Sequence, residues 1–149
     1  MSAFAKDIQQ LLVRDLKKLE TEISQYADEQ SIWKVDKLIA NSAGNLCLHL
    51  CGNIQHYIGA ILGKSGYVRN RDNEFAAKGI ARSSLLEEIR RAIAAVEQTV
   101  PLLKDASLDA VYPQEVLGYP MTTRFFLIHL SAHLGYHLGQ VNYHRRLLG

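Results

Sequence analysis

HLSAHLGYHLGQVNYHRRLLG, residues 129–149, contains four of the chain's six histidines, namely His129, His133, His137 and His144. The gaps between these histidines are four, four and seven residues. On an α-helix, which turns by about 100° per residue, the four imidazoles fall within an arc of roughly 80°. We therefore predict a C-terminal helix on which the histidines share one face.

Apolar residues recur every three or four positions in three further segments, which is the pattern of an amphipathic helix. The four helices are expected at about residues 3–28, 42–63, 83–103 and 122–147. Asn41 or Ser42 suits the cap of the second helix, and Ser84 with Glu87 fits a capping box at the start of the third. Pro101 is expected to kink or end that third helix.

Two polar, turn-rich stretches, residues 64–82 and 104–121, are predicted to be long connections. A brief extended piece is expected near Val111 and Tyr112. Four amphipathic helices bury their apolar stripes best against one another. The fold class is therefore expected to be all-α: one four-helix-bundle domain spanning residues 1–149, with long loops between helices 2 and 3 and helices 3 and 4.

Composition and charge exclude several classes of protein. A formal net charge of +2 without long basic runs argues against nucleic-acid binding. No segment approaches 18 uncharged apolar residues, so no membrane span is expected. The first residues, MSAFAKDIQQLLVRD, lack the apolar core of a signal peptide. With only two cysteines, a cytoplasmic location is the simplest expectation.

Imidazole is a common protein ligand of transition metals, and histidines four apart on a helix lie about 6 Å apart at Cβ. The C-terminal helix offers two such pairs, His129 with His133 and His133 with His137. His49 interrupts an apolar run in the second helix and is the natural third ligand. Three neutral imidazoles would leave an open coordination position on Zn²⁺, Ni²⁺ or Fe²⁺. The same pattern also fits a hydrogen-bonded histidine network in a metal-free core.

Other polar residues lie where they could support the histidines. Asn45 and Asn53 are four residues either side of His49, and Gln140 is three beyond His137, so each is a candidate to orient a ligand or contact substrate. His56 and His144, near helix ends, are expected to be hydrogen-bonded core residues. Cys47 and Cys51 point about 160° away from His49 and are interpreted as small buried apolar residues.

Three charged residues of the 64–82 connection, Arg69, Arg71 and Glu74, could lie over a pocket mouth. A surface salt bridge or an ordering role in the loop is the simpler interpretation of these residues. Binding of an anionic substrate group is the alternative.

The sequence resembles the DinB-like (YfiT-like) superfamily of metalloenzymes along nearly its whole length. The resemblance is carried by NSAGNLCLHLCGNIQHYI (residues 41–58), RNRDNEF (69–75) and SAHLGYHLGQVNYHRRLLG (131–149). Members typically have a histidine in the second helix and HxxxH followed by Gly-Gln in the last. The resemblance implies a four-helix bundle with His49, His133 and His137 as metal ligands, and it makes His129 a pocket residue.

Characterised members of this superfamily use low-molecular-weight thiols. The resemblance therefore implies a metal-dependent enzyme acting on a small molecule, either a thiol S-transferase or a hydrolase. The alternative is a non-enzymatic stress-response module in which the metal tethers helices. Relatives often pair, so the resemblance also implies a homodimer, although the sequence assigns no apolar surface to it.

Overall fold

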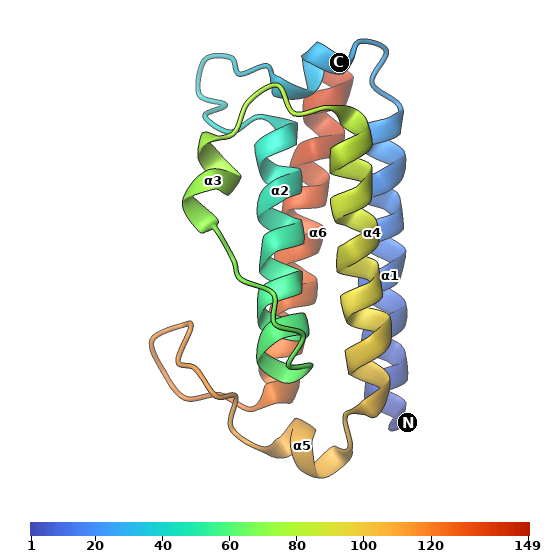
Figure 1. The fold of residues 1–149 in the computed structure, drawn as a ribbon, viewed down its shortest axis with the longest axis vertical. Coiled ribbons are helices and arrows are strands. Elements are labelled where there is room, and N and C mark those ends of the chain that lie inside the picture. Colours follow the sequence, from blue (N-terminus) through green and yellow to red (C-terminus); the bar gives the residue numbers. More distant parts are fainter.

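The computed structural model describes residues 1–149 and is mostly helical (Figure 1). The four long helices are α1 (Ala3–Ser24), α2 (Ala43–Ile54), α4 (Arg82–Thr99) and α6 (Thr123–Leu148). Extended pairing is limited to two isolated backbone bridges, Asp36 with Ile39 and Val111 with Thr122. The expectation of an all-α chain is confirmed.

Hydroxyl side chains cap three of the long helices, each accepting a hydrogen bond from the backbone N–H three residues further on: Ser2 for α1, Ser42 for α2 and Thr122 for α6. Helix α4 has no side-chain cap of this kind and begins before Ser84, so the capping box predicted for Ser84 and Glu87 is wrong. Glu29, more than fifty residues earlier in the chain, accepts a hydrogen bond from the Arg82 N–H instead. A residue from a distant segment therefore pairs with a free backbone N–H group at the start of α4.

The long helices lie side by side, α1 and α6 running in one direction and α2 and α4 in the other (Figure 1). Helix α1 packs on α4 and α6, and α2 packs on the same two helices. Because α2 and α4 run in the same direction, the chain must return along the molecule between them. This return carries a short helix, α3 (Arg71–Ala76), that packs on α2. The connection was predicted as a loop without helix.

The helix bounds differ from the predicted ones mainly at the C-terminal ends. Helix α1 ends at Ser24 rather than near residue 28, and a 3₁₀ turn, η1 (Glu29–Trp33), follows. Helix α4 ends before a second 3₁₀ turn, η3 (Val100–Leu102), which contains Pro101. The second connection contains another short helix, α5 (Asp105–Asp109), that was not predicted.

Helix α2 continues without a break into η2 (Gln55–Leu62), which has the wider π-helical hydrogen bonding. The predicted helix at 42–63 therefore exists, but its last two turns are of a rarer type. Short π-helical segments occur frequently at functional sites, because the extra residue per turn redirects the side chains that follow. Tyr57 lies in this segment and reaches the site described below.

One continuous apolar core of 28 buried residues is shared by all four long helices. His144 lies within it, where the Tyr26 hydroxyl lies 2.6 Å from Nδ1 and the Lys34 carbonyl 2.8 Å from Nε2. The Nε2–H therefore donates to the carbonyl and Nδ1 accepts from tyrosine, as expected of a hydrogen-bonded core histidine. None of the helices is both long and apolar enough to cross a membrane.

Candidate metal centre

His49 of α2 meets His133 and His137 of α6, and their ligand atoms all lie within 4.8 Å of one another. The Nε2 atoms of His49 and His133 are 3.2 Å apart. Nitrogen ligands at 2.0–2.1 Å from a tetrahedral ion are separated from each other by about 3.3–3.4 Å. The distance between these two Nε2 atoms therefore fits a single transition-metal ion held between the two helices.

Hydrogen bonds to Nδ1 fix the ring protons of two of these histidines. His49 Nδ1 lies 3.1 Å from Glu74 Oε1, and His137 Nδ1 lies 2.6 Å from Gln140 Oε1. An ionised carboxylate and an amide oxygen only accept, so each Nδ1 carries the proton. Each Nε2 then keeps a lone pair for a metal. This oxygen–histidine pairing is the usual support of metal-ligating histidines.

Glu74 is the supporting residue that the sequence did not assign. It is buried and accepts hydrogen bonds from Arg69 Nε at 2.9 Å and Nη2 at 3.0 Å, as well as from His49. Burial raises the pKa of Glu74, but the hydrogen bonds with His49 and Arg69 outweigh it and leave the pKa below its ordinary value. The ion pair between Arg69 and Glu74 is buried rather than on the surface.

Two residues of α2 bring Glu74 to His49. The Asn45 amide donates hydrogen bonds to the carbonyls of Glu74 and Ala77, at 3.0 and 2.8 Å, and so ties α3 to α2. Asn45 therefore positions α3 rather than contacting His49. Gly52 leaves the space that the carboxylate occupies, because a Cβ atom there would lie 1.9 Å from Glu74 Oε2.

A cavity of about 180 Å³ adjoins His49 and His133. Its polar wall includes the remaining predicted site residues, His129 and Asn53. The His129 ring stacks on Phe126 at 5.8 Å and lies 6.3 Å from the His133 ring, so His129 belongs to the cavity wall rather than to the three-histidine cluster. Asn53 Oδ1 is buried without a hydrogen-bond partner.

Two other predicted roles have different outcomes. Cys47 and Cys51 are free and buried, as expected of small apolar residues. His56 was expected to be hydrogen-bonded, but its Nδ1 is buried without a partner. The π-helical segment that contains His56 places the ring against Tyr57, at 4.9 Å between centroids, rather than against an acceptor.

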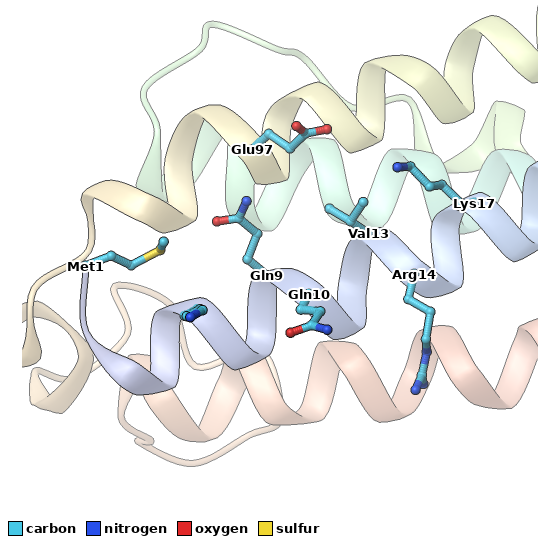
Figure 2. Close-up of a pocket in the computed structure, with 8 residues that line it drawn as sticks. Met1, Gln9, Gln10, Val13, Arg14, Lys17 and Glu97 are labelled. Atoms are coloured by element: carbon cyan, nitrogen blue, oxygen red, sulfur yellow. The ribbon is translucent and has the colours of Figure 1, made fainter.

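A separate surface depression of about 420 Å³ lies between α1 and α4 (Figure 2). Gln9, Val13 and Lys17 of α1 point toward Glu97 of α4 there, whereas Arg14 points away (Figure 2). The depression contains no histidine or cysteine. Although it is larger than the cavity at the histidines, its walls offer an exposed polar surface and no convergent ligands.

Acid should destabilise the metal-free protein through His133. Burial, together with the neighbouring His137, His49 and His129, lowers the pKa of His133 from 6.5 to about 4. Between these two values the unfolded chain takes up a proton that the folded chain does not. The free energy of unfolding should therefore fall as pH falls through this window, by at most about 1.4 kcal/mol per pH unit for this proton.

Urea unfolding of the metal-free protein at several pH values across this window measures the slope. The H133Q variant lacks the titrating ring and should show a flatter dependence. Equal slopes in the two proteins would assign the acid sensitivity to other groups.

The fold and the site together define the class of protein: it is all-helical, with three histidines that converge between helices α2 and α6. The sequence model of the DinB family matches residues 2–149, and the chain belongs to the DinB family. No curated protein matches this sequence.

Proposed function

We propose that His49, His133 and His137 hold one divalent transition metal, Zn²⁺, Ni²⁺ or Fe²⁺, and that the protein is a metal-dependent thiol S-transferase acting on a small molecule. The observation that carries this proposal is the cavity that adjoins His49 and His133. Three neutral imidazoles leave a coordination position open, and an open position beside a cavity is the arrangement of a catalytic site rather than a structural one.

When bound, such a metal lowers the pKa of a thiol or a water molecule placed at the open position. The residues of the chain orient the site: Glu74 and Gln140 hold the rings of His49 and His137 with Nε2 inward. In the proposed transfer, the thiol sulfur gives an electron pair to an electrophilic carbon. The leaving group departs with the old bonding pair, and the thiol proton passes to His129 or to solvent.

Hydrolysis is the second candidate reaction. His129 on the cavity wall favours it, since a neutral imidazole can accept a proton from an attacking water molecule. Thiol transfer is preferred because no carboxylate lines the cavity, and the nearby Glu74 is already bound to Arg69 and His49. A thiol, unlike water, ionises near neutral pH without a strong base.

Metal content of the protein purified without a histidine tag tests the proposal. We expect one divalent transition metal for each chain, and Co²⁺ replacing it should give the intense visible absorption of a tetrahedral site. Adding a small thiol should then produce a sulfur-to-cobalt charge-transfer band. A protein that contains no metal and binds none would refute the proposal. A metal site that binds neither thiol nor other added ligands would instead favour the non-enzymatic module.

Four further features belong to this proposal: the type of bundle, the single domain, the compartment and the partner. The packing of α1, α2, α4 and α6 supports a four-helix bundle of the YfiT-like type, and the single shared core supports one domain over residues 1–149. The free Cys47 and Cys51 are compatible with a reducing, cytoplasmic compartment. The expected partner is the small-molecule substrate, with no nucleic acid or membrane.

A further inference from the structure

The charged side chains that line the cavity at His49 and His133 are all positive. Arg69 and Arg71 both line it, and no carboxylate does. The charge of Arg69 is matched by Glu74, at 2.9 Å from Nε. Arg71 has no such partner among the ion pairs of the molecule, so the cavity carries an uncompensated positive charge.

Arg71 is held close to the histidines through an aromatic ring. Its guanidinium carbon lies 5.3 Å from the centroid of the Phe75 ring, within the range of a cation–π contact. The Phe75 ring in turn lies 4.9 Å from the His49 ring. A group bound by Arg71 would therefore be separated from His49 of the metal centre by the Phe75 ring alone.

Asn53 supplies an independent sign that a ligand enters this cavity. Its side chain is only 7% exposed and lines the cavity, yet Oδ1 has no hydrogen-bond partner. Buried polar atoms are almost always paired, so an unpaired one facing a cavity indicates a missing ligand or water. At about 180 Å³ the cavity is smaller than the usual 300–1,000 Å³ of drug-sized sites. It suits a small molecule or the reactive end of a larger one.

We propose that Arg71 binds an anionic group, such as a carboxylate, of the thiol substrate, with Asn53 hydrogen-bonded to the part between that group and the sulfur. This inference rests on the proposed thiol-binding metal centre. To the proposed function it adds that the thiol substrate is negatively charged and that Arg71 selects it for this charge. A charged donor paired with a carboxylate gives a strong interaction, and removal of the donor should weaken binding by about ten- to a hundred-fold.

Two thiols that differ only in charge test this inference. The Co²⁺-loaded protein is titrated with 3-mercaptopropionate and with its neutral amide, and the sulfur-to-cobalt charge-transfer band reports binding of each. We expect tighter binding of the carboxylate, and loss of that preference in R71Q without a change for the amide. R90Q, which removes an exposed arginine of α4, is the matched control and should keep the preference.

The outcomes of this experiment distinguish failure of the role of Arg71 from failure of the proposed metal centre. Equal affinities for the two thiols in the native protein, or an undiminished preference in R71Q, would overturn the role of Arg71 while leaving the metal centre intact. Failure of Co²⁺ to bind at all would overturn the proposed function, and this inference with it.

Discussion

Replacing His133 with alanine should abolish metal binding, and replacing His129 should leave it intact. His133 Nε2 lies 3.2 Å from His49 Nε2, so its loss removes one of the three ligands proposed for the metal. Loss of a residue that merely orients a ligand typically lowers metal affinity by about 10–100-fold. Loss of the ligand itself should exceed this, leaving no metal bound at micromolar concentration. Co²⁺ titration followed by visible absorption measures the difference.

His129 is a demanding control for this experiment. It is on the same helix, four residues earlier, and before the fold is considered it is as good a ligand candidate as His137. In the structure it stacks on Phe126 and lies outside the cluster. H129A should therefore bind metal with unchanged stoichiometry and spectrum. Equal loss of metal in H129A and H133A would contradict the assignment and point to a pair at His129 and His133.

The part of the site that could be predicted from the sequence is the part held by local geometry. His133, His137 and Gln140 are three or four residues apart on one helix, so helix periodicity alone places them on one face. His49 could be nominated because a histidine interrupted an apolar run. Whether His49 meets the histidines of α6 depends on how the two helices pack, which helix periodicity does not reveal. The family resemblance was what grouped His49 with His133 and His137.

Glu74 could not be assigned from its surroundings in the sequence. It reaches His49 because the chain returns along α2 between two helices that run in the same direction, and helix α3 is too short to give a clear periodic pattern. Glu29 at the start of α4 is a similar case, since it comes from a segment far away in the chain. One local signal existed: Gly52 lies on the His49 face of α2, and glycine often marks a position that another group approaches closely.

Gly52 gives the second large expected effect. In a helix interior, alanine is normally more stable than glycine by about 1 kcal/mol. Here G52A should instead destabilise the protein, because the added Cβ would lie 1.9 Å from Glu74 Oε2. The carboxylate would have to leave Arg69 and His49, and breaking a buried ion pair costs about 3–5 kcal/mol. We expect a net loss of about 2–4 kcal/mol in urea unfolding.

The same substitution should weaken metal binding, because His49 would lose the acceptor that fixes its Nδ1 proton. A decrease of about 10–100-fold in Co²⁺ affinity is expected, the range for loss of such a partner. This decrease should appear without loss of the three histidines themselves. An unchanged affinity in a folded G52A protein would mean that His49 is oriented by packing alone.

A double-mutant cycle separates the clash from any other effect of the methyl group. In the E74A background the carboxylate that blocks the new Cβ is absent, so G52A should no longer destabilise the protein. It should stabilise it by up to about 1 kcal/mol, as an ordinary helical glycine-to-alanine change does. The sign of the effect therefore reverses between the two backgrounds if the contact with Glu74 is the cause. An equal cost in both backgrounds would show that Gly52 is required for some other reason, and that the carboxylate does not depend on it.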